Sequence, residues 1–348
     1  MPAVDPTNSR ILVTGANGYL AMWVIRTLLE QGYTVRAVVR SLEKGKHLME
    51  YFSSYGDKVE LFVVEDLIKD GSFDEAVKGV DAIEHLASPA TFEPVEPDDY
   101  IKPAIQGTVG ILESARNDKV KRIVITSSVV VVYNSMKEVT QMVTFDETQW
   151  GDDVIEVVKK MGRDASPWKS IAHRRLAAWE FYNQHKSEVQ WDLTTLLPSF
   201  VWGPPVQILK GPQYLNESLK ILWSMITDYQ PDEALRRTFS LIHNRDVSAA
   251  HVVALRKETA GGERILVTNG SYIWQGIRNL IHTLKPELYT SGILPRGNPT
   301  LGTEISYQYD SEKAKRILEL DYASAEKVFN DTLDYFKDRG WLEKPVRA

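Results

Sequence analysis

Eight residues near the start of the sequence have types and spacing that predict chemistry: Thr14-Gly15-Ala16-Asn17-Gly18-Tyr19-Leu20-Ala21. They follow the apolar run Ile11-Leu12-Val13 and precede apolar residues at helical spacing. Gly15 permits a tight turn, Gly18 lets the backbone approach a pyrophosphate, and the start of the helix offers free N–H groups to an anion. This order of strand, turn and helix predicts a dinucleotide site. Its cofactor-binding residues would be Gly15, Asn17, Gly18, Tyr19 and Leu20.

The end of the next strand, residues 34–40, indicates which dinucleotide is bound. An acidic residue there would bind the ribose 2′-hydroxyl of NAD, but this chain has Arg40, followed by Ser41 and Lys44. A guanidinium matches a 2′-phosphate in charge and in bidentate geometry. We therefore predict NADP(H) as the cofactor, held by Arg40 and Lys44, with a solvated charge after a strand as the alternative.

The elements that must position this loop alternate between strand and helix from residue 10 to about residue 130. This rhythm predicts an α/β fold, a Rossmann-type doubly wound parallel sheet with helices on both faces. A capping box of Ser72 and Glu75 predicts a further short helix. We expect residues 1–198 to form the NADP(H)-binding domain. Residues 199–348 would mainly form a smaller substrate-binding domain, with segments around 240–270 returning to the first.

Composition excludes several classes of protein. The 348 residues carry a net charge of −6 and no basic tail, which argues against nucleic acid or a membrane as partner. The absence of cysteine excludes disulfides and thiolate chemistry. We expect no metal site, because His243 and His251, eight residues apart, do not share a helix face. The first residues lack the features of a signal peptide, so a cytoplasmic protein is expected, with its oligomeric state left open.

Several motifs occur together in family order: the loop at 14–20, Val38-Val39-Arg40-Ser41, residues 65–67, 85–89, 126–128, 177–181, 201–204 and 243–247. Across roughly residues 8–340 the chain resembles the extended short-chain dehydrogenases, specifically the fungal aldehyde and ketone reductases related to methylglyoxal reductase and dihydroflavonol reductase. The resemblance implies that Asp66 and Leu67 border the adenine. It also implies that Ala87 and Ser88 line the cofactor and that Val201 lies near the nicotinamide carboxamide.

The resemblance also implies a carbonyl-reducing set of a serine and a Tyr-x-x-x-Lys pair on one helix. Ser128 matches the serine, unless it simply ends a strand. The pair should stand at positions 167 and 171, but the chain has Pro167 and Ile171, and no tyrosine lies between 134 and 181. The family's proton donor is therefore missing from the sequence.

Three nearby residues are candidates for replacing the lost pair. Asp164 and Trp168 would stabilise a cation as a carboxylate and an aromatic face. The alternative is a structural role for each, as a loop or capping carboxylate and as a packing residue. Arg174 shares a helical face with positions 167 and 171 and would hold cofactor or substrate, with a surface or ion-pair arginine as the alternative.

Four functions remain open at this point. The first is an NADPH-dependent reductase of an imine or iminium, in fungal alkaloid-type secondary metabolism, because an iminium needs no proton after hydride arrives. The second is a non-redox cyclase or isomerase that keeps the cofactor as a scaffold. The third is carbonyl reduction with a substitute acid, Tyr133 or a water relay, and the fourth is a binding-only protein. Nine tryptophans and fifteen tyrosines suggest a bulky, flat small-molecule substrate, although most of these rings are expected in the core.

Overall fold

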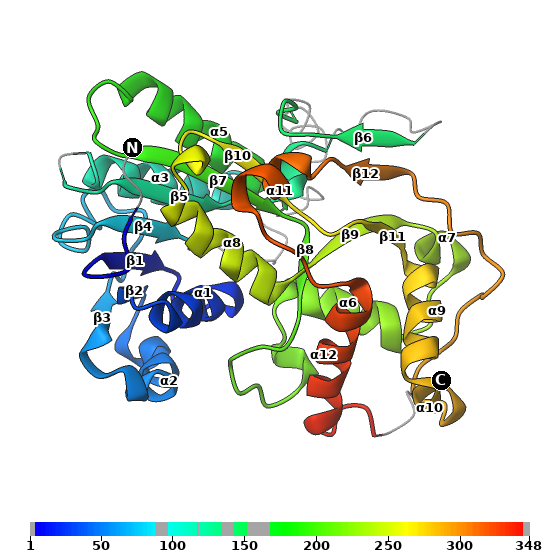
Figure 1. Cartoon of the computed structure of the whole chain (residues 1–348). Coiled ribbons are helices and arrows are strands. Elements are labelled where there is room, and N and C mark those ends of the chain that lie inside the picture. The colour runs from blue at the N-terminus through cyan, green and yellow to red at the C-terminus, as the bar shows by residue number, and fades with distance from the viewer. Residues whose placement is uncertain (1–3, 88–96, 117, 134–141, 152–167, 344–348) are drawn as a thin grey trace.

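A seven-stranded parallel sheet forms the centre of the protein in this computed structural model (Figure 1). The structure describes residues 4–87, 97–116, 118–133, 142–151 and 168–343, of which residues 97–100 and 168–175 are described by their backbone alone. The strands lie in the order β3, β2, β1, β4, β5, β7, β10. Their bounds are β1 Arg10–Thr14, β2 Thr34–Val39, β3 Val59–Val63, β4 Ala82–His85, β5 Arg122–Thr126, β7 Asp192–Pro198 and β10 Arg264–Val267.

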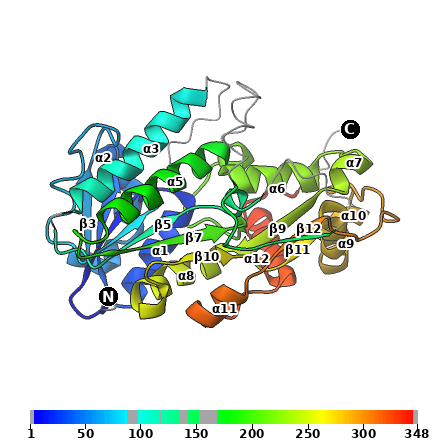
Figure 2. The same cartoon turned by 90° about the horizontal axis from the view of Figure 1, so that it is seen from above.

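Helices cover both faces of this sheet (Figure 2). One face carries α3 (Pro97–Ser114) and α5 (Trp168–His185), and the other carries α1 (Tyr19–Glu30), α8 (Asn244–Arg256) and α11 (Glu312–Leu318). Most of the strands are buried on both sides, so their residues do not alternate regularly between apolar and polar. In β1, for example, Ile11 and Val13 pack towards α1 and α8, and Leu12 packs towards α3 and α5.

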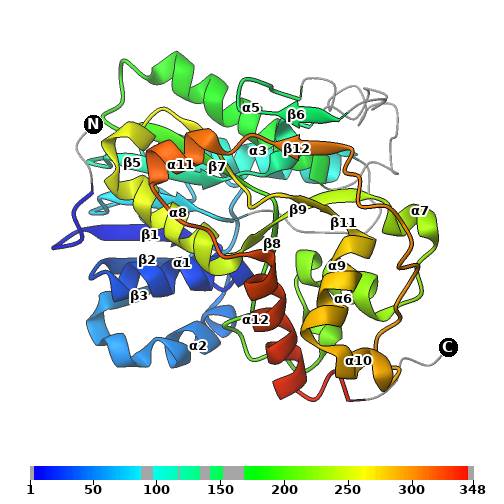
Figure 3. The same cartoon turned by 45° about the vertical axis from the view of Figure 1, so that its right-hand side comes forward.

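A second lobe is built around a three-stranded sheet (Figure 3). Trp202 lies at the centre of its core with no exposed surface, and its ring contacts Phe239, Trp274 and Phe329. The indole N–H donates to the Ser218 carbonyl at 2.8 Å. The elements of the lobe are β8 Phe200–Trp202, β9 Thr238–His243, β11 Ser271–Ile273, α6 Glu217–Thr227, α7 Asp232–Leu235, α9 Trp274–Leu284, α10 Pro286–Thr290 and α12 Ala325–Asp338.

The remaining elements are short. A separate parallel pair joins β6 (Val143–Phe145) to β12 (Tyr307–Tyr309). Helix α2 (Leu42–Tyr51) follows β2, and the 3₁₀ turns are η1 Ser53–Lys58, η2 Val129–Val131, η4 Pro212–Tyr214 and η5 Glu258–Ala260. Across the described ranges, no helix combines the length and the apolar character that crossing a membrane requires.

The predicted α/β doubly wound sheet is confirmed, and β10 joins it after the chain has passed through the second lobe. A buried arginine also links early and late parts of the chain. Arg122 of β5 forms an ion pair with Asp192 of β7 at 2.6 Å, and it donates a hydrogen bond to the Ala254 carbonyl at the end of α8. The division into domains at residue 198 stays a prediction.

The predicted short helix at Ser72 is wrong. Residues 71–79 form turns, and the Glu75 side chain pairs with Lys78 instead of reaching back to cap a helix. The Ser72 hydroxyl is buried and has no partner in the described part of the chain. A capping box stabilises the N-terminus of a helix only when both of its reciprocal hydrogen bonds form, and neither forms here.

Candidate cofactor and active site

The turn after β1 lies against the end of β4, where the order of the strands reverses. Gly15 has a φ of +64°, and a Cβ there would stand 2.9 Å from the Ala87 Cα. Only glycine combines this conformation with so close an approach. In an open α/β sheet, ligands bind in the crevice outside the carboxyl ends of the strands at such a point. Gly15 and Ala87 therefore lie where the sequence predicts the cofactor.

Thr14 connects the end of β1 to the end of β4. Its buried hydroxyl accepts the Ala87 N–H at 3.0 Å and lies 2.9 Å from His85 Nδ1. Because the hydroxyl accepts from Ala87, its own hydrogen is free to go to the imidazole. This bond fixes β4 relative to the phosphate loop.

The start of α1 offers backbone donors to an anion. Gly18 is its N-cap, no side chain caps the helix, and the first turn contains no acidic residue. Asn17 and Gly18 are exposed, whereas Leu20 packs against the core. A helix start with unsatisfied N–H groups and no competing carboxylate fits a pyrophosphate.

The Tyr19 side chain points to a structural contact. Its hydroxyl donates to the Gly203 carbonyl at 2.9 Å and accepts from the Asn244 side-chain amide at 3.0 Å. Burial raises the pKa of the Tyr19 phenol well above its ordinary value. Only the backbone of Tyr19 is therefore placed to contact a phosphate. Gly203 has a φ of +135°, and a side chain there would collide with Asn244. The contact between Gly203, Tyr19 and Asn244 therefore gives a structural reason for the motifs at residues 201–204 and 243–247.

Arg40 and Lys44 are both exposed beyond the carboxyl end of β2. Ser41 is the N-cap of α2, and its hydroxyl accepts the Lys44 N–H at 3.4 Å. The sequence predicts that Lys44 helps to hold NADP(H), and the cap shows that the Lys44 backbone also orders this turn. Two cations at the end of β2 fit an additional phosphate.

The other predicted cofactor residues lie on different elements. Asp66 is exposed and accepts the Ile68 N–H at 3.0 Å, and Leu67 packs against the core beside α3. Val201 lies in β8, where its carbonyl accepts the Ser218 hydroxyl at 2.9 Å. Ser88 lies outside the described residues.

Ser128 and Tyr133 follow the carboxyl end of β5. Ser128 is half-buried, and its hydroxyl accepts the Val130 N–H at 3.3 Å at the start of η2. The Tyr133 ring packs against Phe145 and Tyr307, with centroids 5.2 and 5.0 Å away. Burial raises the pKa of Tyr307, and the nearby Tyr133 phenol raises it further. Tyr133 thus belongs to a cluster of aromatic rings that β6 and β12 complete.

The remaining predicted residues cannot be placed by their side chains. Asp164 lies outside the described residues, as does Pro167. Trp168, Ile171 and Arg174 lie in the first turns of α5, where only the helical backbone is described. Their proposed roles stay predictions.

The structure also joins three residues whose contact the sequence did not predict. Glu84 of β4, His251 of α8 and Thr126 of β5 are linked by two hydrogen bonds inside the core. One signal was visible, because Glu84 places a carboxylate between Ile83 and His85 in a strand of the central sheet. Its partners could not be identified, since 167 residues separate it from His251.

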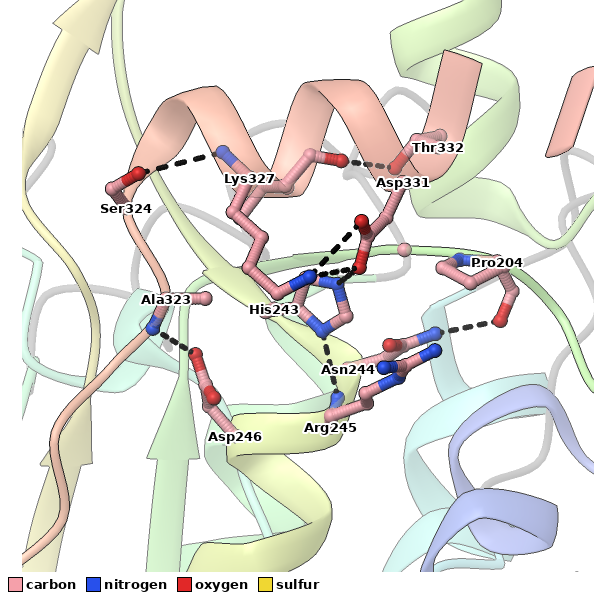
Figure 4. A network of polar contacts seen from close by, with 12 residues as sticks. Pro204, His243, Asn244, Arg245, Asp246, Ala323, Ser324, Lys327, Asp331 and Thr332 are labelled. Atoms are coloured by element: carbon pink, nitrogen blue, oxygen red, sulfur yellow. Dashed lines mark hydrogen bonds and ion pairs between the residues drawn. The ribbon is translucent and has the colours of Figure 1, made fainter. Parts of the chain in front are cut away.

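A second polar network joins the start of α8 to α12 (Figure 4). His243 Nδ1 accepts the Arg245 N–H at 3.1 Å, and Nε2 lies 3.2 Å from an Asp331 carboxylate oxygen. Lys327 pairs with Asp331 at 3.0 Å. Burial lowers the pKa of His243 to about 4, against the opposing charge of Asp331. This network connects the last long helix to the helix that touches the phosphate loop through Asn244.

Comparisons with known proteins agree with this geometry. The 3-beta hydroxysteroid dehydrogenase/isomerase family matches residues 12–274. The NADPH-dependent methylglyoxal reductase of Saccharomyces cerevisiae is 30% identical over 335 residues, covering 92% of this chain and 96% of that protein. A ketoreductase of Aspergillus niger is 32% identical over 337 residues, covering 93% and 96%. The crystal structure of yeast methylglyoxal/isovaleraldehyde reductase complexed with NADPH superposes with a TM-score of 0.83 at 28% identity, covering 95% and 99%.

The fold and the phosphate loop define a Rossmann-type oxidoreductase of the extended short-chain dehydrogenase kind. The chain belongs to the 3-beta hydroxysteroid dehydrogenase/isomerase family, among fungal methylglyoxal reductases and ketoreductases. The predicted family is thereby confirmed.

Proposed function

We propose that this chain is an NADPH-dependent reductase whose substrate carries an imine or iminium carbon. This choice of substrate class rests on one observation. The sequence has Pro167 and Ile171 where the resemblance to the family places its catalytic tyrosine and lysine. Reduction of a ketone leaves an alkoxide, which needs an acid in place. Reduction of an iminium leaves a neutral amine, so the loss of a phenol acid is tolerated.

The described residues fit NADPH. The Gly15 cradle against Ala87, the uncapped start of α1 and the exposed Arg40 together offer a pyrophosphate site and a 2′-phosphate site. Relatives that share the fold bind or use NADPH. When bound, NADPH supplies a hydride. The chain's own part is to hold the substrate near Ser128, with residues 199–348 forming most of the substrate-binding lobe.

A second candidate is carbonyl reduction with Tyr133 as substitute acid. Tyr133 lies five residues after Ser128, next to Tyr307, in a cluster rich in phenols. The yeast and Aspergillus relatives are named as carbonyl reductases, which favours this reading of the reaction. Against it, Tyr133 is packed against two rings, which limits how far its hydroxyl can reach.

One substrate panel separates these functions. Purified protein is incubated with NADPH and either a cyclic imine, an N-methylated iminium salt or the ketone of matching shape, and cofactor oxidation is followed. We expect turnover of the first two and little of the ketone. Ketone turnover that disappears in Tyr133→Phe would establish the second candidate instead. A product formed without cofactor consumption would identify a cyclase or isomerase.

The iminium proposal also includes a carboxylate. Asp164→Asn should slow turnover at least tenfold, a loss of about 1.4 kcal/mol of transition-state stabilisation, with NADPH affinity unchanged. Glu180→Gln, on the exposed side of α5, also removes one carboxylate and is the matched control. Equal rates in the wild type and Asp164→Asn would remove Asp164 from the mechanism.

A further inference from the structure

Three side chains form a series that runs from the core to the carboxyl edge of the sheet. Glu84 Oε2 lies 2.6 Å from His251 Nδ1, and His251 Nε2 lies 3.1 Å from the Thr126 hydroxyl. The side chains of Glu84 and His251 have no exposed surface, whereas Thr126 is half-buried. A carboxyl, an imidazole and a hydroxyl are therefore connected in a line, of which Thr126 is the least buried member.

The requirements of the core do not explain this arrangement. The second carboxyl oxygen of Glu84, Oε1, has no hydrogen-bond partner among the described residues. Burial raises the pKa of Glu84, and His251 only partly opposes this effect. A buried carboxyl with an unsatisfied oxygen is unfavourable compared with an apolar side chain in the same strand. The arrangement therefore suggests a role other than packing.

The Thr126 end of this line lies where chemistry is expected. Thr126 is the last residue of β5, and Ser128 follows two residues later. Ligands of doubly wound sheets bind at this edge. With Pro167 and Ile171 in place of the family's pair, a proton for the substrate must come from another group.

We propose that Glu84, His251 and Thr126 form a proton relay that protonates the nitrogen of a neutral imine substrate. This inference rests on the proposed function and identifies the acid that would replace the family's tyrosine. The Thr126 O–H bond breaks as a substrate N–H bond forms, and the Thr126 oxygen takes the proton of His251 Nε2. His251 Nδ1 then takes a proton from the Glu84 carboxyl, which becomes a carboxylate. The product of this transfer is the iminium, and water at Thr126 reloads the relay in the reverse direction after release.

The roles within the relay differ. Thr126 is the catalytic residue, because its hydroxyl contacts the substrate nitrogen. Glu84 and His251 are positioning residues that store and pass the proton. A permanently charged iminium needs no proton, so its reduction does not use the relay.

Two substrates therefore test the proposal. The full-length protein with NADPH is assayed on a cyclic imine and on its N-methylated iminium salt. We expect Glu84→Gln and Thr126→Val to lower kcat/KM for the neutral imine by roughly a hundredfold and to leave the iminium salt within about twofold. Thr126→Ser keeps the hydroxyl and should recover most of the lost rate. Thr108→Val, which removes a buried hydroxyl within α3, is the matched control.

A measurement without substrate accompanies the kinetics. In proton NMR of the wild type, the proton between Glu84 Oε2 and His251 Nδ1 should resonate far downfield, and this signal should be lost in Glu84→Gln while NADPH affinity holds. Equal rate losses on both substrates would show a structural role and overturn the relay, leaving the reductase proposal intact. Full activity of Thr126→Val on the neutral imine would also overturn it. A wild type that reduces neither substrate would overturn the proposed function, and the relay with it.

Discussion

Acidification should weaken the fold through His243, whose side chain is 1% exposed. Burial lowers its pKa from 6.5 to about 4, so the unfolded chain takes up a proton before the folded protein does. The stabilisation is therefore complete above pH 6.5 and is lost as the pH falls towards 4. A shift of this size corresponds to about 3 kcal/mol in total, of which about 2 kcal/mol is lost between pH 7 and pH 5.

The assay is urea unfolding at pH 7, 6 and 5 of the wild type and His243→Asn. Asparagine still caps α8 but does not titrate, so this variant should be less stable at pH 7 by about 1 kcal/mol and should lose less stability on acidification. His282→Asn, which removes a half-buried imidazole from α9, is the control and should follow the wild type. Parallel curves for the wild type and His243→Asn would refute the linkage.

Three further predictions concern the cofactor site and the second lobe. Gly15→Ala forces a Cβ against Ala87 at a positive φ and should raise the Kd for NADPH by about tenfold or more in a fluorescence titration. Gly32→Ala, at a positive φ in open space, should leave that Kd unchanged, and equal effects would contradict the steric argument. Arg40→Gln should weaken NADPH by roughly 10- to 100-fold and leave NADH binding unaltered, and a parallel loss of both would exclude a 2′-phosphate contact. Trp202→Ala should cost about 3–5 kcal/mol in urea unfolding, and a loss below about 1 kcal/mol would mean that the ring cluster does not hold the lobe together.

Local patterns explain why the sheet could be predicted. The run Ile11-Leu12-Val13, followed at once by Gly15, specifies a strand and a turn within a few residues. The Ser72 prediction failed for a comparable local reason, because Glu75 has a competing partner in Lys78, three residues further on. Sequence spacing shows that a capping box is possible but does not show which partner its carboxylate chooses.

The contacts that shape the candidate site join distant parts of the chain. Asn244 donates a hydrogen bond to Tyr19, which is 225 residues away in the sequence, and no periodicity in the sequence predicts this contact. Glu84 was visible as a carboxylate within a strand, but its partner is an imidazole from a helix in the second half of the chain. Residue type and spacing therefore predicted the phosphate loop, and they could not predict the side chains that surround it.

The late return of β10 has a consequence for how the protein is made. A chain that ends at residue 198 has no β10, so β7 becomes an open edge whose N–H and C=O groups invite pairing with other chains. Arg122 then also lacks the Ala254 carbonyl that its guanidinium contacts. During synthesis, β10 can pair with β7 only after residue 267 has emerged from the ribosome. Residues 1–198 are therefore expected to aggregate when they are expressed alone, even though they contain the whole phosphate loop.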